Sequence, residues 1–425
     1  MEAPLRSLRL RCSVQNYEWG RRGEESTVAR LFERNSGAQI DLACPYAEFW
    51  MGTHDSGPSF LMLAGSDSGE VALKKWIREN PGALGDKVVA KWGTGLPFLF
   101  KILSVAKALS IQTHPDKELA RMLHMMRPSV YKDPNHKPEM AIALTEFKAL
   151  CGFVSMEELK DVLSVPEITE LVGNDEGSKI IQTRELNGYM NAKAVMQSAF
   201  IKLMSSNRDV ISTLVSKLKN RLFSYKNSEF RGQRLSEKEQ LALLLEKQYQ
   251  ADVGVLASFF FNYVKLSPGE ALYIGPNEPH AYISGECIEC MAASDNVVQA
   301  GLTPKYVDIQ TLCSMLTYKQ GFPEILRGIS LNPYVTRYAP PFDEFEVDRC
   351  ILPSKESVLF SPVPGPSIFI IVAGEGQLQM GSVIEERVAE GDAYFVPAHS
   401  QISFSASDDK PIHLYRSGVN SRIFG

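Results

Sequence analysis

The residues of this chain that could do chemistry gather in residues 280–305, HAYISGECIECMAASDNVVQAGLTPK. The segment just upstream, PGEALYIGPNEP, predicts a strand entering a tight turn, because Gly269 and Pro276 punctuate alternating apolar positions. His280 then begins the next strand of an antiparallel sheet, a position that suits a metal ligand or a plain hydrogen-bonded histidine. The same stretch holds three acids: Glu286, Glu289 and Asp295.

A second candidate pair comes from residues 96–115, LPFLFKILSVAKALSIQTHP, which predict two apolar strands broken near Ala106. Gln112 and His114 are two positions apart on the second strand, so both side chains project from the same face. Two metal-capable groups on one face indicate a ligand pair, and a solvated polar edge is the competing interpretation.

A third ligand candidate opens the next strand. Glu139 follows a segment with the turn chemistry of Asp-Pro-Asn and precedes the apolar run 140–144. A carboxylate at the mouth of a strand, beside His136 and Lys137, is a reasonable partner for the Gln112 and His114 pair. His54 and Glu48, which lie in an aromatic-rich segment near the start, are interpreted as structural polar groups.

The cysteines predict neither a disulfide framework nor a zinc knuckle. Seven cysteines are an odd number scattered over a long chain, which favours reduced thiols in the cytosol. Cys287 and Cys290 form the one close pair, and a knuckle would need a second pair. Because the flanking segments alternate like strands, these two cysteines are expected to be small buried hydrophobes.

Composition indicates an ordinary globular protein. The length of 425 residues predicts two or three domains. The hydrophobic fraction of 44% and the charged fraction of 22% are typical of globular proteins. A net charge of −5 excludes the basic footprint of a nucleic-acid-binding protein. There is no apolar run long enough for a membrane span and no signal-peptide h-region, so a cytoplasmic location is expected. We also expect a monomer.

The elements that must position these residues are strands at both ends of the chain with helices between them. Residues 154–250 read as a series of helices, several with a serine cap, and contain no histidine or cysteine. Catalytic ligands are therefore not expected there. Strand patterns return from residue 254 and again from 335.

A weak internal repeat links the two strand regions. PGEALYIGPNEPHAY, residues 268–282, resembles EGDAYFVPAHSQISF, residues 390–404, with a one-residue slip at the proline turn. The match suggests two copies of a small jelly-roll unit, a cupin-like barrel. In the second copy the position of His280 falls at Gln401 or Ile402, so the C-terminal barrel is expected to bind no metal.

Three segments together resemble type I phosphomannose isomerases: LSIQTHPDK, YKDPNHKPEMA, which is close to the family signature Y-x-D-x-N-H-K-P-E, and residues 280–305. NYEWG and PYAEFWMGTH near the start also match, and the likeness to plant members is strong. The resemblance implies a mainly β fold: a cupin-like catalytic domain (1–153 and 251–334), a helical insertion (154–250) and a C-terminal jelly roll (335–425).

The resemblance also implies an activity and its site. It implies one zinc ion per chain and interconversion of mannose 6-phosphate and fructose 6-phosphate through a cis-enediol, feeding GDP-mannose synthesis. The family's zinc ligands fall on Gln112, His114, Glu139 and His280. Candidates for proton transfer are Glu289, Lys137, His54 and Asp295, and candidates for holding the phosphate and hydroxyls are Ser110, Lys305, Lys137 and Asp295.

One position departs from the family pattern. The family signature reads Asn-x-aliphatic-Arg-Ala-Gly-x-Thr-Pro-Lys, whereas this chain reads DNVVQAGLTPK and places Gln299 at the arginine. Glutamine lacks the charge and the planar fork with which arginine grips phosphate or a developing oxyanion. The zinc ligands do not depend on this residue. A zinc-holding homologue with weak or no turnover, acting as a sugar-phosphate-binding protein, is therefore the alternative hypothesis.

Overall fold

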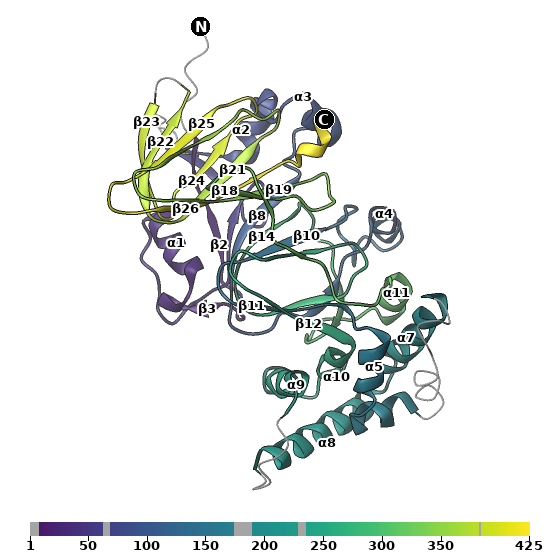
Figure 1. Ribbon diagram of the computed structural model, residues 1–425. Coiled ribbons are helices and arrows are strands. Elements are labelled where there is room, and N and C mark those ends of the chain that lie inside the picture. Colours follow the sequence, from purple (N-terminus) through teal and green to yellow (C-terminus); the bar gives the residue numbers. More distant parts are fainter. Residues whose placement is uncertain (1–7, 63–68, 174–188, 228–234, 382–383) are drawn as a thin grey trace.

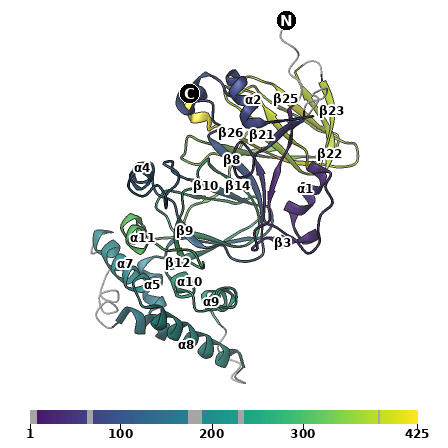
Figure 2. The ribbon, with the colours of Figure 1, turned by 180° about the vertical axis from the view of Figure 1, so that it is seen from behind.

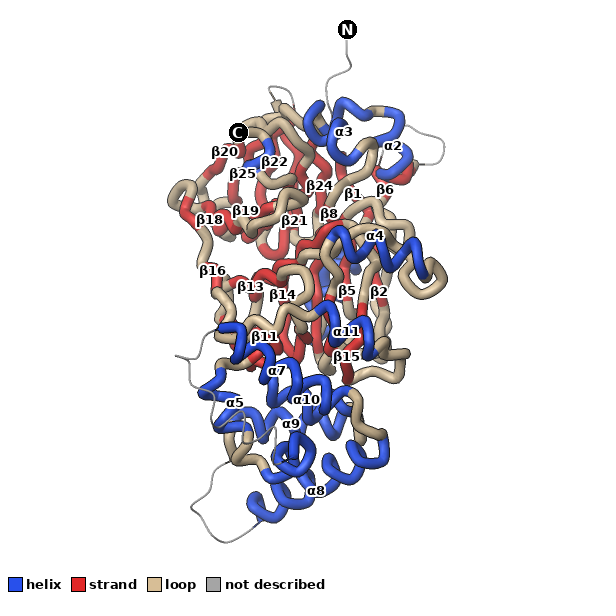
Figure 3. Tube along the Cα trace, turned by 90° about the vertical axis from the view of Figure 1, so that its right-hand side faces the viewer, coloured by secondary structure: helices blue, strands red, loops and turns tan. Residues whose placement is uncertain are grey.

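Two β-barrels lie against each other, and a group of helices extends from the far end of one of them (Figure 1). The structure is a computed structural model that describes residues 8–62, 69–173, 189–227, 235–381 and 384–425. Figure 3 shows the strands in two stacked regions, with the helical insertion below them and shorter helices at the top and side. This arrangement confirms the predicted mainly β fold with an inserted helical region.

The barrel next to the helices is called the first barrel. Its main sheet has the order β16-β13-β10-β14-β8-β5-β2, and β11, β12, β9 and β15 complete it. Its strands are β2 (Ser13–Gln15), β5 (Glu48–Met51), β8 (Phe98–Val105), β9 (Ile111–Thr113), β10 (Glu139–Ala143), β11 (Phe147–Phe153), β12 (Phe261–Leu266), β13 (Ala271–Ile274), β14 (His280–Ala292), β15 (Val298–Gly301) and β16 (Ile325–Leu326).

Strand β14 closes this barrel because it pairs with different strands along its 13 residues. Its start pairs with β11 and β9, and its later part pairs with β8 and β10. Gly285, where β14 passes between the two sets, has φ 113°, and a Cβ there would lie 2.4 Å from the carbonyl oxygen of Glu146. Glycine allows this crossing because other residues rarely adopt such a conformation and have no space here.

The second barrel holds the C-terminal part of the chain and also its start. Strand β1 (Leu8–Arg11) lies between β24 and β6, so that Leu8 faces Phe395. This pairing joins the N-terminal strand to the C-terminal sheet. The predicted domain boundaries near residues 153 and 335 stay predictions. The other strands are β6 (Phe60–Met62), β7 (Glu70–Ala72), β17 (Ile329–Ser330), β18 (Val335–Tyr338), β19 (Glu346–Leu352), β20 (Ser357–Phe360), β21 (Ser367–Ala373), β22 (Glu375–Met380), β23 (Ile384–Ala389), β24 (Ala393–Val396), β25 (Ile402–Ala406) and β26 (Ile412–Gly418); β3 (Arg21–Arg22) and β4 (Pro45–Tyr46) form a small separate sheet.

The internal repeat is visible as strand–turn–strand units in both barrels. Strands β13 and β14 correspond to β24 and β25, and Asn277 and His399 occupy equivalent turn positions with φ 62°. The spacing is the same throughout, so the one-residue slip suggested by the prolines does not occur. Ile402 therefore stands where the first barrel has His280.

The two barrels share an apolar core. Along β10, Ala141 and Ala143 face the interior of the first barrel, whereas Met140 and Ile142 pack in the cluster that contains Tyr415 of the second barrel. This alternation follows from the two-residue period of a strand. Residues on one face of β10 therefore reach the barrel interior, and those on the other face meet the second barrel.

One group of helices forms the insertion, and the other helices lie along the edges of the barrels (Figure 2). The insertion packs on the first barrel through an apolar cluster that includes Phe153, Phe200 and Phe261. Among the described residues, no helix is both long and apolar enough to span a membrane. The helices with described bounds are α1 (Thr27–Ser36), α2 (Leu73–Glu79), α3 (Asp86–Trp92), α4 (Lys117–Met126), α5 (Met156–Val162), α7 (Tyr189–Met204), α8 (Arg208–Asn227), α9 (Glu237–Gln248), α10 (Val253–Ala257) and α11 (Ile309–Met315).

Candidate active site

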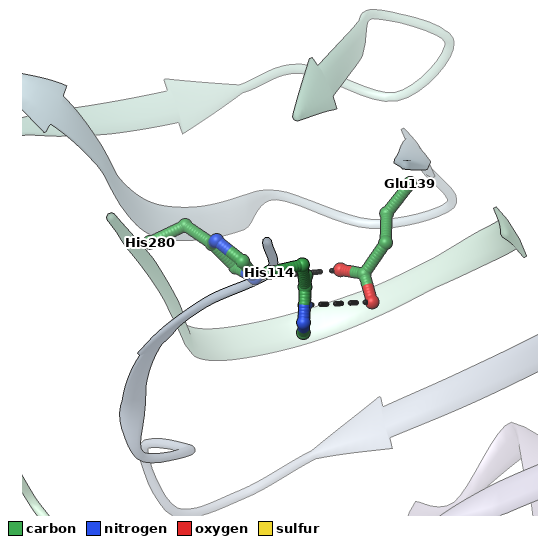
Figure 4. Close-up of side chains that lie close together, drawn as sticks. All are labelled: His114, Glu139 and His280. Carbon is green, nitrogen blue, oxygen red and sulfur yellow. Dashed lines mark ion pairs between the residues drawn. The ribbon is translucent and has the colours of Figure 1, made fainter. Parts of the chain in front are cut away.

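Three side chains meet inside the first barrel (Figure 4). His114 follows β9, while Glu139 and His280 are the first residues of β10 and β14. The Nε2 atom of His114 lies 3.2 Å from Glu139 Oε1, and His280 Nε2 lies 3.4 Å from Glu139 Oε2. All three side chains are buried, with exposed fractions of 1–2%. They form the metal-site cluster.

The metal-site cluster has the donor set of a bound cation. His114 Nε2, His280 Nε2 and Glu139 Oε2 are buried and have no hydrogen-bond partner. Buried polar atoms are rarely left unpaired, so three of them converging on one point fit the coordination of a cation. Ligands about 2.0–2.2 Å from one tetrahedral zinc ion lie roughly 3.3–3.6 Å apart, close to the spacing seen here.

The backbone fixes which nitrogen of each histidine faces the cluster. His114 Nδ1 lies 2.6 Å from the carbonyl oxygen of Asn296, and His280 Nδ1 lies 3.1 Å from that of Glu278. A carbonyl oxygen only accepts, so each hydrogen bond requires a proton on Nδ1. The lone pair is then on Nε2 and points into the cluster, as metal-binding histidines are commonly held.

The charge states inside the cluster also suit a cation. Burial lowers the pKa of His114 to about 4, and Lys137 adds to this, so the imidazole is neutral near pH 7. Burial would raise the pKa of Glu139, but Lys137 and His114 outweigh it and hold the pKa well below its usual range. His114 is therefore neutral and Glu139 ionised, the forms in which these side chains bind metal.

Gln112 and Gln299 extend the same face toward the barrel edge. In the strand register, His280 faces Gln112, and Gln112 faces Gln299 on β15. Directly opposed residues of antiparallel strands project from the same face. Gln112 is therefore placed beside His280. The Oε1 atom of Gln299 is buried and has no hydrogen-bond partner.

A buried lysine links two acids next to the cluster. Lys101 Nζ lies 3.1 Å from both Glu48 Oε2 and Glu289 Oε2, and Trp50 Nε1 donates to the same Glu48 oxygen at 2.6 Å. Burial would lower the pKa of Lys101, but the two carboxylates outweigh it and raise the pKa above its ordinary value. A cationic lysine is thus held inside the barrel.

Glu289 lies on β14, the strand that pairs with β10, on the same face of the sheet as Glu139. Met291 faces Glu139 in the register, and Glu289 is two residues from Met291 on the same face. Burial raises the pKa of Glu289, with Glu139 and Glu48 adding to the effect and Lys101 opposing it. A carboxyl group with a raised pKa beside a metal-site cluster has the chemistry of a proton carrier.

The remaining candidate residues lie at different distances from this centre. Lys137 Nζ is 3.2 Å from Glu139 Oε1, so it belongs to the site. His54 Nε2 lies 3.2 Å from Asp295 Oδ1, and the Asp295 side chain is 65% exposed. Ser110 is half-buried just before β9, and Lys305 is exposed. Neither of these last two forms a side-chain hydrogen bond or ion pair with another residue in the described part of the chain.

Comparison with known proteins identifies the family. Models of the catalytic domain, the helical insertion domain and the C-terminal part of type I phosphomannose isomerases match residues 7–156, 171–261 and 338–383. The chain belongs to this family. Mannose-6-phosphate isomerase 2 of Arabidopsis thaliana is 57% identical over 98% of this chain and 94% of its own length. The human mannose-6-phosphate isomerase is 37% identical over 98% and 99%.

Solved phosphomannose isomerases share the fold. A point mutant of the Salmonella typhimurium enzyme matches with a TM-score of 0.80 and 28% identity, covering 98% of this chain and all of that one. A mannose 6-phosphate isomerase bound with zinc and yttrium matches with a TM-score of 0.80 and 27% identity, covering 97% and 99%. The family and the cupin-like fold predicted from the sequence are therefore confirmed.

Lys101 was missed in the sequence analysis. The signal for Lys101 was a single charge inside the apolar run FLFKILSV, which the structure shows as the fully buried strand β8. A lysine in such a strand is almost never buried without a partner, so it predicts a buried acid nearby. Glu48 and Glu289 are such acids, and the pairing of Glu48 with Lys101 fits its interpretation as a structural polar group.

Proposed function

We propose that this protein is a zinc-dependent aldose–ketose isomerase that interconverts mannose 6-phosphate and fructose 6-phosphate. The observation that carries the proposal is the metal-site cluster with its three unpaired ligand atoms, next to a buried carboxyl group of raised pKa. Membership of the phosphomannose isomerase family supports the choice of substrate. The cytoplasmic location, the monomeric state and the place in GDP-mannose synthesis stay predictions from the sequence.

His114, Glu139 and His280 would hold the zinc ion, with Gln112 beside them as the fourth ligand. Bound there, zinc would supply positive charge that stabilises the negative charge developing on the sugar oxygens. Lys137, which contacts Glu139, adds a second positive charge at the edge of the cluster. The buried position of these groups excludes water and strengthens their electrostatic effect.

Glu289 is our candidate for the group that moves the proton. As a carboxylate it takes the proton from C2 of the aldose, which leaves a cis-enediolate whose negative charge is on O1. The hydroxyl proton then moves from O2 to the adjacent O1. As the acid, Glu289 returns its proton to C1, and the ketose forms. A raised pKa suits both steps, because the group must accept and donate a proton at the same pH. Lys101 and Glu48 hold it in place.

A coupled assay for fructose 6-phosphate formed from mannose 6-phosphate tests the proposal. We expect turnover that depends on zinc. It should be absent in His280→Ala. In the wild-type protein, a chelator should abolish it and added zinc should restore it. Metal analysis of the same samples shows whether the loss follows the zinc content. A folded, zinc-loaded protein without turnover would refute the proposal and leave the sugar-phosphate-binding homologue suggested by Gln299.

A further inference from the structure

A carboxylate from the second barrel holds the loop that carries Lys137 and Glu139. Glu344 lies in the connector between β18 and β19, and its Oε1 is 2.8 Å from His136 Nε2. The side chains are 6% and 16% exposed, so this hydrogen bond is largely shielded from water. His136 donates it, because a carboxylate oxygen accepts.

The connector that carries Glu344 is itself firmly attached. Asn420 Nδ2 donates to the carbonyl oxygens of Pro340 and Phe345, at either side of Glu344 in the chain. The Phe342 ring packs edge-on against Tyr273 of the first barrel at a centroid distance of 5.9 Å. Glu344 is thus presented from a fixed support rather than from a loose loop.

The loop on the other side is tied to the first barrel by separate bonds. Asn135 Nδ2 donates to the carbonyl oxygen of Ala293 at 3.1 Å, and Ser294 Oγ donates to that of Asn135 at 3.0 Å. The next residue, His136, turns toward Glu344, whereas Lys137 turns to Glu139 at 3.2 Å. The segment is therefore anchored on one side to the first barrel and on the other to the second.

We propose that Glu344 is a positioning residue: through His136 it fixes the segment from which Lys137 and Glu139 project. This gives the second barrel a part in the site of the first barrel, although it contributes no ligand to the metal-site cluster. Burial opposes the ionised form of Glu344, but His136 outweighs it and lowers the pKa, so the carboxylate is charged near pH 7. The kinetic part of this inference rests on the proposed function.

The test compares Glu344→Ala with Asp343→Asn as a matched control. Asp343 is in the same connector and forms ion pairs with Lys91 and Arg422, outside the 131–139 segment. We expect hydrogen exchange in residues 131–139 to speed up about tenfold or more in Glu344→Ala and to change by less than about twofold in the control. Equal exchange rates in the two variants would overturn the inference.

Turnover gives a second measure. We expect Glu344→Ala to lower kcat/KM about 10–100-fold, the usual effect of removing a partner that orients a site residue, with unchanged zinc content. Glu344→Gln keeps an acceptor for His136 and should recover most of the activity. In a His136→Ala background, Glu344→Ala should have no further effect, and a further loss there would show that Glu344 acts by another route.

Two controls keep the outcomes distinct. If Glu344→Ala does not fold, His136→Ala removes the same hydrogen bond from the loop side and should speed up exchange in residues 131–139 equally. If the wild-type protein has no turnover, the proposed function fails, whereas hydrogen exchange still decides whether Glu344 orders the loop. Faster exchange that spreads evenly over both barrels would contradict a positioning role.

Discussion

Replacing Gln299 by arginine tests how this chain differs from its family. Gln299 faces Gln112 across the β15–β9 pair, and Gln112 faces His280, so its side chain is on the face that bears the metal-site cluster. Its buried Oε1 has no partner, which costs about 1–3 kcal/mol for a typical buried acceptor. Arginine has no acceptor, so Gln299→Arg removes that cost and adds a positive charge.

The expected gain is smaller than a full oxyanion-stabilising group would give. Such a group typically accelerates a reaction about 10²–10³-fold, or roughly 2.7–4 kcal/mol. Lys137 and Lys101 already place positive charge in the site. If a like charge stands about 8 Å from the new guanidinium, their repulsion costs roughly 2 kcal/mol at an effective dielectric constant of 20. The difference is about 1–2 kcal/mol, so kcat/KM for mannose 6-phosphate should rise about tenfold.

Steady-state kinetics with metal analysis separates the explanations. The gain should be mainly in kcat, because a charge that acts on the transition state changes kcat more than binding. Gln299→Met also removes the unpaired acceptor but adds no charge, so it should not produce the gain. Unchanged kcat/KM in Gln299→Arg, or an equal gain in the methionine variant, would refute the electrostatic reasoning. Zinc content should be one per chain in all three proteins.

Three further predictions concern the metal and the buried charges. Chelation should lower the melting temperature, because a bound ion stabilises the folded state by mass action, and a second tightly bound zinc in the second barrel would contradict the ligand assignment. Lys101→Met should lower the free energy of unfolding by roughly 3–5 kcal/mol at pH 7 in denaturant, because it leaves the buried Glu289 carboxylate without its cation. The loss should be smaller at pH 5, where protonation of Glu289 relieves its repulsion with Glu139 and Glu48. Burial would raise the pKa of Asp348, but Arg337 and Arg416 outweigh it and lower the pKa. The ionised carboxylate therefore stabilises the fold above its ordinary pKa near 4, and this stabilisation is lost as the pH falls through the pKa of the folded state. Asp348→Asn should therefore destabilise by about 3 kcal/mol at pH 7 in urea unfolding, and the difference should shrink in acid.

The parts of the site that obey a local period could be predicted from the sequence. The interrupted apolar run around Ala106 gave β8 and β9, and the turn after Ile274 placed His280 at the start of β14. The turn before residue 140 made Glu139 a third ligand candidate, and resemblance to the family then placed it at the same point as His280. The distance in sequence between Glu139 and His280 is bridged only by the pairing of β10 with β14.

The features that the sequence did not predict depend on contacts between distant elements. Nothing in the first strand shows that Leu8 pairs with Phe395, since an edge of either barrel would accept an alternating strand. Likewise, the role of Lys101 becomes visible only when Glu48 and Glu289 approach it from two neighbouring strands. Such pairings are set by the assembly of the sheet and not by the period of any one segment.

Comparison of the two barrels shows why burial of charge alone does not mark a functional site. The second barrel buries Asp348 as deeply as the first buries Glu139, but Arg416 donates to Asp348 at 2.7 Å and Arg337 donates to it at 2.7 and 2.9 Å. That carboxylate is satisfied by the protein itself, so a ligand would have to displace a strong pair. In the first barrel, Glu139 and two histidines keep unpaired atoms aimed at one another, which costs free energy unless something binds. The absence of a histidine at position 402 and the internal pairing of Asp348 are thus two parts of one difference: the second barrel is built to be stable, and the first is built to bind.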